Sequence, residues 1–423
     1  MSEYVPIEIQ AEILKRLPSK PLIQFRSVSQ SWKRLIDSPN FMVSYAVRHP
    51  QPDRFILRYA LPDYDHIVED QYLFFVDNDD ENDHNGFVQQ DIVPTIPDLV
   101  KRIGSYSTVV GSSQGLVCFV GDYEYPYNYD SSEFDGAKMV VVWNPSIGKC
   151  VGIQVPEMYY SPNENYRIDD VIGFGVCPVT LDPTILKIEC IDYRKQLNGG
   201  MHGTGVPWKV RVFTLTTGTW SILSTNLPRE SIGLCNGLSR GWSQVVIDRF
   251  IYWLAYDYMG YAEDGRFQKH FLIMSFDLTA KEFKEINFPD SLINQPCRIE
   301  TISKLRECLV LLEFHRDLKT DLSVWCVWMM KEQGVSESFT KLYTFNLPDT
   351  TVNTLLGCRK TGALILETWH DHRNYAELQI YEPNSEAVEL EIDGIDQFFS
   401  LCSYKDSLLL VDQLDGFIYS ISH

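Results

Sequence analysis

Residues 141–156, VVWNPSIGKCVGIQVP, hold the pattern that decides the fold. An apolar β-branched run ends in an aromatic residue, a polar turn follows, and a second run stops at a proline. The same order recurs in VFTLTTGTWSILSTNLP at 212–228 and in SFDLTAKEFKEINFP at 275–289. Short runs of β-branched and aromatic residues bounded by turn residues are typical of β-strands. Each segment is therefore predicted to be a β-hairpin.

A lengthened version of the hairpin spans 328–348, and a version without the final proline spans 380–393. The aromatic anchors of the five hairpins are Trp143, Phe213, Phe276, Trp328 and Tyr381. Another strand pair precedes each hairpin, so the unit has about four strands in roughly 50–60 residues, the size of a propeller blade. The strand-like ends 54–92 and 397–421 are left over. Joined in one sheet they give six blades and a closed ring; as separate blades they give seven.

The first 46 residues differ from the rest, because they read as short helices broken by prolines. Pro6 suits the first turn of a helix, and Ile9, Ile13, Leu14 and Leu17 then fall on one helical stripe. This stripe predicts an amphipathic helix with one apolar side.

Two more short helices are predicted after Pro18. Leu22 and Phe25 form a second apolar face, and Ser27 is the expected N-cap of a third helix that carries Trp32. Three short helices in about 45 residues are too small to support a core alone. The helical unit is therefore expected to bury its apolar faces on a partner or on the neighbouring domain.

The resulting domain plan is an all-α unit over residues 1–46, a linker over 47–53 and a large all-β domain over 54–423. The net charge is −20, but the first 49 residues hold seven Lys and Arg against four Asp and Glu. The acidic body disfavours binding to nucleic acid, whereas the basic front favours an acidic partner. No apolar run approaches the ~18 residues of a membrane-spanning helix.

The ten cysteines show no CxxC spacing and mostly lie in apolar strand-like runs. This distribution favours buried thiols in a reducing compartment, the cytoplasm, the nucleus or both. No HExxH, GxSxG, P-loop or dinucleotide-binding motif is present, so no catalytic residue and no cofactor are expected. GSSQG at 111–115 reads as a β-turn.

Two stretches carry metal-binding residue types, but neither is expected to bind a metal. His370 and His372 lie two residues apart but lack a third ligand. Residues 77–86 carry five carboxylates, but Asn82 and Val88 stand where a calcium loop needs Gly and Glu.

A long insertion at 121–135 is rich in tyrosine, which supplies contact area at low entropic cost. Its candidates for contact with a protein target are Tyr123, Tyr125, Tyr127 and Tyr129. The alternative is an excursion without a binding role.

Taken in order, these segments resemble two domains of one family. Residues 5–41, VPIEIQAEILKRLPSKPLIQFRSVSQSWKRLIDSPNF, are similar to the F-box. GSSQGLVCF, VVWNPSIGK, IGFGVCP, VIDRFIYWLA and SFDLTAKEF resemble the F-box-associated, kelch-like domain of plant F-box proteins. Two positions depart from the pattern, since Val5 replaces the usual Leu before proline and Ser29 replaces the common Cys before the last helix.

The resemblance implies a function. The F-box would dock on a Skp-type adaptor, which bridges to cullin and the RING ubiquitin-ligase machinery, and the β-domain would hold an unidentified target protein for ubiquitylation. The positions that match the motif are the expected adaptor contacts: Val5, Pro6, Ile9, Ile13, Leu14, Leu17, Pro18, Leu22, Val28 and Trp32. Alternatively, half of them form the internal core of the helical unit together with Phe25 and Leu35.

Two other functions stay open at this point. A propeller enzyme such as a glycosidase would use paired acids that line the central channel. A non-degradative binding module would use the adaptor for stability alone. The basic N-terminal helices disfavour the enzyme hypothesis, because a glycosidase does not need a helical unit that binds another protein.

Overall fold

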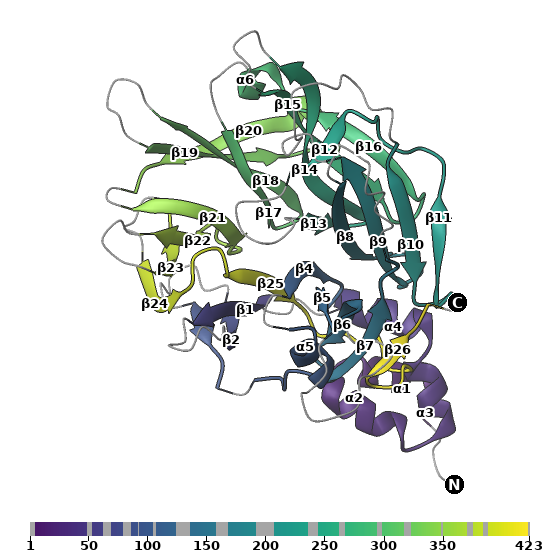
Figure 1. The fold of residues 1–423 in the computed structure, drawn as a ribbon. Coiled ribbons are helices and arrows are strands. Elements are labelled where there is room, and N and C mark those ends of the chain that lie inside the picture. The colour runs from purple at the N-terminus through teal and green to yellow at the C-terminus, as the bar shows by residue number, and fades with distance from the viewer. Residues whose placement is uncertain are drawn as a thin grey trace.

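The computed structural model describes residues 5–48, 53–61, 69–78, 86–91, 93–104, 107–123, 136–157, 168–191, 207–235, 244–261, 267–293, 298–316, 323–347, 350–369, 375–383 and 388–421. Helices at the N-terminus are followed by a large all-β domain (Figure 1). No helix in these ranges is long and apolar enough to cross a membrane.

The β-domain consists of six sheets arranged around a central axis, so the prediction of a six-bladed propeller is confirmed (Figure 1). Two blades are formed by β4 (Thr108–Ser113), β5 (Leu116–Asp122), β6 (Lys138–Asn144) and β7 (Lys149–Gln154), and by β8 (Ile168–Val176), β9 (Pro183–Ile191), β10 (Lys209–Thr214) and β11 (Thr219–Leu223). The next blade has β12 (Ile232–Leu234), β13 (Gln244–Ile247), β14 (Phe250–Tyr261), β15 (Phe267–Asp277) and β16 (Glu282–Asn287). Two further blades have β17 (Arg298–Leu305), β18 (Cys308–Arg316), β19 (Ser323–Met330) and β20 (Phe339–Phe345), and β21 (Thr351–Cys358), β22 (Leu364–Trp369), β23 (Ala376–Tyr381) and β24 (Val388–Gly394).

The two ends of the chain share the sixth blade. Its strands are β1 (Asp53–Leu61), β2 (Glu69–Asp77), β3 (Phe87–Gln89) and β25 (Ser400–Tyr404), and β25 pairs antiparallel with β1 as the innermost strand. The remaining C-terminal strand, β26 (Phe417–Tyr419), instead pairs parallel with β7 on the outside of the first complete blade. The ends therefore close the ring as expected, and the last residues also reinforce a neighbouring blade.

The five aromatic anchors all lie on the third strand of their blades. Trp143, Phe213, Phe276 and Trp328 are buried, and Tyr381 is partly buried. A middle strand that has a blade on either side is buried on both faces, which is why β6 is a continuous run of apolar residues.

The polar turns of the first three hairpins share one backbone feature. The last turn residue has a positive φ, 69° at Gly148, 64° at Gly218 and 59° at Lys281. A left-handed residue at this place returns the chain into the fourth strand with the twist of the sheet. The repeated motif therefore encodes the same turn with two different residue types.

The helical unit has four helices and not the three that were predicted. They are α1 (Ile7–Leu14), α2 (Ser19–Arg26), α3 (Gln30–Ile36) and α4 (Pro39–Arg48). The additional helix begins at Pro39, the first helical position, which proline favours. Ser29 and not Ser27 caps α3, because its hydroxyl accepts a hydrogen bond from the Trp32 amide at 3.2 Å.

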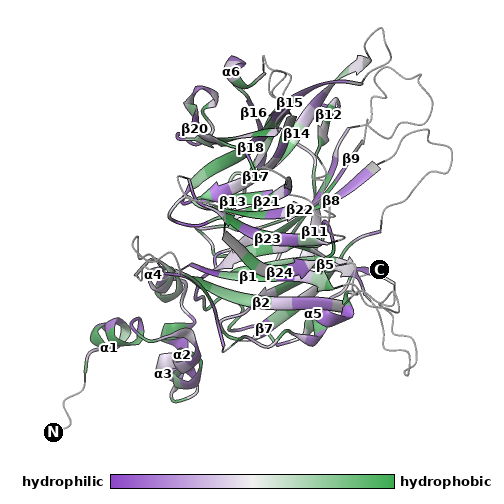
Figure 2. Ribbon diagram, turned by 90° about the vertical axis from the view of Figure 1, so that its left-hand side faces the viewer, coloured by the Kyte–Doolittle hydropathy of each residue, from purple (hydrophilic) through white to green (hydrophobic). Residues whose placement is uncertain are grey.

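The helices α1–α4 lie beside one face of the propeller, to the left of the blades in Figure 2. We call this the helix face; it carries the turn between β6 and β7, whose Ser146 contacts α2. Because successive strands of a blade are antiparallel, the second strands end and the third strands begin on the opposite side. We call that side the loop face. The short helices α5 (Asp98–Arg102) and α6 (Asp290–Ile293), with a 3₁₀ turn at Ser336–Ser338, belong to connections of the β-domain.

Candidate protein-binding surface

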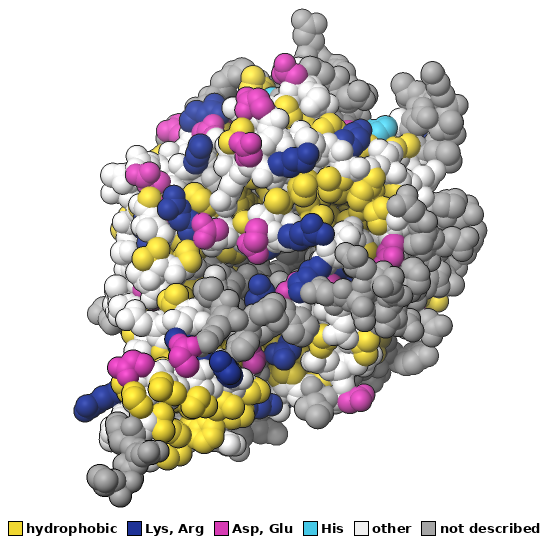
Figure 3. All heavy atoms as spheres, turned by 180° about the vertical axis from the view of Figure 1, so that it is seen from behind, with side chains coloured by type: hydrophobic (Ala, Val, Ile, Leu, Met, Phe, Trp, Pro, Cys, Tyr) yellow, Lys and Arg dark blue, Asp and Glu magenta, His cyan; other side chains and the backbone are white. Residues whose placement is uncertain are grey.

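Apolar side chains are exposed along one side of α1. Ile9 and Ile13 are 52% and 55% exposed, and Val5 lies four residues before Ile9 and is also exposed. Figure 3 shows hydrophobic side chains gathered over the helical unit, at the lower left of the molecule. We refer to Val5, Ile9 and Ile13 as the apolar stripe. Contiguous exposed apolar patches mark surfaces that bind another protein or a membrane.

The other expected contact residues fall into two groups. Pro6, Pro18 and Val28 are exposed, and Val28 is 64% exposed. Leu14 and Leu22 are buried in the core of the helical unit, whereas Leu17 and Trp32 pack partly buried against that core. Because Leu14 and Leu22 are buried, they can affect partner binding only by holding the exposed residues in position.

Trp32 positions the helix that carries the apolar stripe. Its indole Nε1 donates a hydrogen bond to Oε1 of Gln10 in α1 at 2.6 Å, and its ring meets Phe25 of α2 edge to face with centroids 5.4 Å apart. Three helices are thus tied together at one side chain. Phe25 and Leu35 pack against the helical core, in agreement with the alternative reading of these two residues.

The helical unit also carries more exposed basic than acidic side chains. Arg16, Lys20, Lys33 and Arg34 are exposed, as is the acidic Glu8 of α1. Arg26 forms an ion pair with Asp37, with Nη2 and Oδ2 2.8 Å apart, and the hydrogen bond to Asp37 raises the pKa of the guanidinium. Exposed charges of one sign steer a partner of opposite charge and fix its register. The local charge therefore favours an acidic partner.

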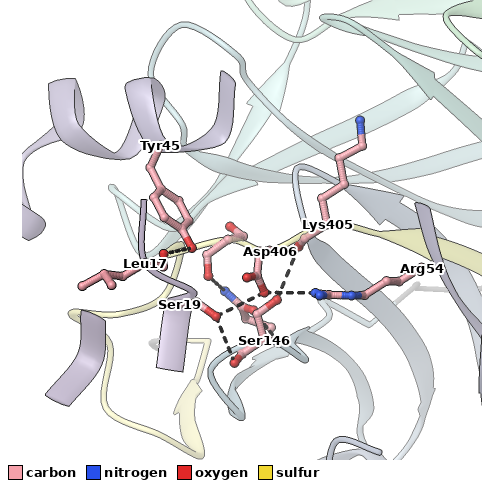
Figure 4. Close-up of polar contacts among 9 residues, drawn as sticks. Leu17, Ser19, Tyr45, Arg54, Ser146, Lys405 and Asp406 are labelled. Atoms are coloured by element: carbon pink, nitrogen blue, oxygen red, sulfur yellow. Dashed lines mark hydrogen bonds and ion pairs between the residues drawn. The ribbon is translucent and has the colours of Figure 1, made fainter. Parts of the chain in front are cut away.

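The helical unit is itself bound to the propeller through a small polar cluster (Figure 4). The Ser19 hydroxyl lies 3.3 Å from the Ser146 carbonyl oxygen and 3.2 Å from Oδ1 of Asp406. Arg54 of β1 donates to the same Asp406 oxygen at 3.2 Å. Within the unit, the Tyr45 hydroxyl donates to the Leu17 carbonyl at 3.1 Å. Asp406 thus joins α2 to the blade that closes the ring.

Asp406 belongs to a segment, residues 405–419, that we call the C-terminal strap. Asn144 is fully buried, and its amide donates to the carbonyls of Ser407 at 3.0 Å and Leu409 at 2.8 Å. Its own oxygen accepts from the Ser146 amide. The residues of the WNPS motif, read from sequence as a family mark, therefore hold the end of the chain.

Residues 411–415 of the strap are bound to the same hairpin. Lys149 donates to the carbonyls of Val411 and Gln413, both at 2.7 Å. The Cys150 amide donates to Oδ1 of Asp415 at 2.9 Å, immediately before β26 pairs with β7. The strap is thus fixed along its length to one hairpin.

One tyrosine of the tyrosine-rich insertion lies in the described structure, and it corrects the expectation. Tyr123 is only 3% exposed and packs with Leu99, Val100 and Ile103, while its hydroxyl accepts a hydrogen bond from Arg102 at 3.1 Å. Polar neighbours in sequence made it look exposed, but the helix α5 covers its ring. Tyr125, Tyr127 and Tyr129 lie outside the described residues.

Neither a metal site nor paired catalytic acids stand out in the described ranges. No three His, Cys, Asp or Glu side chains there are close enough to hold a metal ion. His370, His372 and residues 79–85 of the acidic run 77–86 lie outside these ranges. The last two residues of GSSQG, Gln114 and Gly115, form the predicted tight turn between β4 and β5, and both have a positive φ.

Two buried carboxyl groups, those of Glu367 and Glu313, bond to structural groups. Glu367 accepts a hydrogen bond from the Gln397 amide at 2.6 Å, and burial raises its pKa to about 7. Glu313 accepts from the indole Nε1 of Trp328, one of the aromatic anchors. They lie on β22 and β18 of different blades, and each bonds to a structural group.

Family models match both parts of the chain. The model described as "F-box domain" matches residues 5–44, and the model described as "F-box associated beta propeller domain" matches residues 131–411. The chain is 27% identical to the F-box protein CPR1 of Arabidopsis thaliana, over 81% of this chain and 73% of that protein. It is 24% identical to an F-box/kelch-repeat protein of the same plant, over 80% of this chain and 78% of that protein.

Solved structures with a similar arrangement are more distant. The β-propeller domain of the Trilobed protease from Pyrococcus furiosus aligns with 70% of this chain and 95% of its own, at 10% identity and a TM-score of 0.34.

Proposed function

The chain belongs to the F-box proteins that carry an F-box-associated β-propeller domain, and we propose that it is the target-recognition subunit of a ubiquitin ligase of the Skp–cullin–F-box type. The helical unit binds a Skp-type adaptor and the propeller binds the protein to be ubiquitylated. The chain supplies no catalytic group of its own. We expect the protein to act in the cytoplasm, the nucleus or both.

The observation that carries this proposal is the exposed apolar stripe. About half of the Ile9 and Ile13 side chains is exposed to solvent. Burying that half against a partner would stabilise the complex by about 1 kcal/mol for each side chain. Val28, Pro6 and Pro18 are further exposed apolar side chains of the helical unit, and Arg16, Lys20, Lys33 and Arg34 are exposed basic ones. An apolar centre with a charged rim is the usual anatomy of a protein–protein interface.

Target binding is assigned to the loop face. The helical unit occupies the opposite side of the propeller, so a target on the loop face does not compete with the adaptor. The second strands of the six blades end on this face, and connections on a rigid scaffold commonly carry binding residues. Tyr125, Tyr127 and Tyr129 lie between β5 and β6 in the sequence and remain candidates for target contact.

The mechanism is proximity. Two binding surfaces on one body raise the effective concentration of the target near the ubiquitin-charged enzyme, without any reaction in the receptor itself. The rate of ubiquitin transfer then depends on how firmly both surfaces are held relative to one another.

Affinity purification of the full chain with proteasome activity inhibited tests the proposal. We expect the adaptor and cullin to co-purify, together with a target that is lost when the propeller is removed. Adaptor without cullin would instead support the non-degradative binding module. Absence of both would refute the assignment.

A further inference from the structure

The C-terminal strap has a second set of contacts that the proposed function does not use. One side of the strap is bound to the β6–β7 hairpin through Asn144 and Lys149, and the other side faces the helical unit. The N-terminal helices and the last residues of the chain thus meet, although about 380 residues separate them in sequence.

Leu408 of the strap is part of the helical core. It is 2% exposed and belongs to the apolar cluster that contains Leu14, Leu22, Ile36 and Phe41. A core of four short helices is small, so one buried leucine supplied from outside is a large share of it. The helical unit is therefore completed by a side chain of the propeller's last segment.

Polar contacts reinforce this junction at two points. Asp406 accepts hydrogen bonds from Ser19 of α2 and from Arg54 of β1. Further along, Asp412 attracts Arg26 at the end of α2, since its charge contributes to the raised pKa of that guanidinium. The strap therefore contacts the first residue of α2 and carries a charge that favours the cation at its last residue.

The strap is firmly seated on the propeller side. At Gly115 a side chain would lie 2.5 Å from the Lys405 carbonyl oxygen, so only glycine lets the strap pass this close to the β4–β5 turn. At the far end Tyr419 packs edge to face on Phe213 of the adjacent blade, with centroids 5.4 Å apart. Because the strap is fixed to the propeller at both ends, it can hold the helical unit that packs against the residues in between.

We infer that the C-terminal strap is a latch that completes the core of the helical unit and fixes its orientation on the propeller. The covalent connection through residues 49–52 is short, but the contacts of Leu408 and Asp406 set the direction of the apolar stripe. The N-terminal helices accordingly reach their final packing only after the C-terminal residues have been added to the ring.

The double variant Leu408→Ala and Asp406→Ala tests the latch in the full chain. Hydrogen–deuterium exchange should become about tenfold faster or more across α1–α3, because opening of the helical unit no longer breaks these contacts. Exchange in β17–β20, on a distant blade, should be unchanged. Small-angle scattering should show a wider range of overall dimensions, as the helices move relative to the propeller.

Leu414→Ala is the matched control, because Leu414 lies on the same strap and is 73% exposed. It should leave exchange and scattering as in the unmodified chain. If the double variant unfolds the propeller, Ser19→Ala combined with Leu408→Val removes the same contacts more gently and carries the test. Exchange in α1–α3 equal to that of the control would overturn the latch. Neither readout involves the adaptor, so failure here leaves the proposed function standing.

Discussion

Replacing Arg359 with methionine should destabilise the propeller more than any surface substitution, because it leaves a buried carboxylate without its cation. Arg359 follows β21 and Asp77 ends β2, so the pair joins the fifth repeat to the blade that closes the ring. The two side chains are 2% and 1% exposed. Nε and Nη2 of Arg359 each lie 2.9 Å from Oδ1 of Asp77.

The expected magnitude follows from this burial. Removing one partner of a buried ion pair costs about 3–5 kcal/mol, most of which is the unpaired charge that remains. Asp77 keeps one hydrogen bond, from the Lys360 amide at 3.2 Å, which does not compensate a full charge. The second change Asp77→Asn removes that charge and keeps an acceptor for the amide. The double variant should therefore regain about 1–2 kcal/mol or more relative to Arg359→Met.

Urea unfolding followed by tryptophan fluorescence measures both variants, with the slope of the transition used to check that the same surface is exposed. Lys101→Met is a suitable control, because Lys101 forms an exposed pair with Asp98 and such pairs contribute about 0–1 kcal/mol. A double variant no more stable than Arg359→Met would show that the charge at Asp77 is not what the arginine compensates.

Two further predictions concern single side chains. Burial raises the pKa of Glu367 from 4.5 to about 7, so the folded state keeps its proton to higher pH than the unfolded state, and stability should fall by up to ~3 kcal/mol between pH 4.5 and 7. The Glu367→Gln variant should lose this part of the pH dependence. If the urea midpoint changes between pH 5 and pH 8 by the same amount in the variant as in the unmodified chain, the prediction is wrong. Leu22→Ala, at a fully buried site, should destabilise the helical unit by about 2–5 kcal/mol, whereas the exposed Val28→Ala should change it by less than about 0.5 kcal/mol. Amide exchange in α1–α3 measures that difference, and equal effects would refute the division into core and surface.

The propeller could be predicted because its signal is local and repeated. Each anchor such as Trp143 stands on a third strand, between a β-branched run and a turn, and the spacing of the anchors gives the blade length. The closing blade was one of the two predicted alternatives, since the two leftover ends can pair to remove their edges. The parallel pairing of β26 with β7, which also holds the C-terminal end of the chain, could not be predicted. It involves only three residues of each strand and has no signature in the sequence.

The surface of the helical unit could be predicted only in part. The four-residue spacing placed Ile9 and Ile13 on one side, but whether a side faces solvent depends on long-range contacts. Leu14 and Leu22 are covered partly by Leu408, which comes from the other end of the chain. Tyr123 was misjudged for the same reason, because the side chains that cover it come from α5, about 20 residues earlier.

The function of Asn144 could not be deduced from its motif. An Asn-Pro-Ser sequence is a turn signal, and the sequence alone shows only that the hairpin turns there. The partners of the Asn144 amide are backbone carbonyls of residues 407 and 409. Backbone carbonyls occur at every residue, so no feature of the strap sequence reveals which of them are bound.

The central claim is that the apolar stripe binds the adaptor, and titration of the full chain with a purified Skp-type adaptor tests it most directly. The variant Ile9→Asp with Ile13→Asp removes two half-exposed anchors and places charges in the interface, a loss of about 3 kcal/mol or more, so affinity should fall at least ~100-fold. Ile222→Asp, at a 76% exposed position of the propeller, should bind like the unmodified chain. Unchanged affinity in the stripe variant would contradict the account.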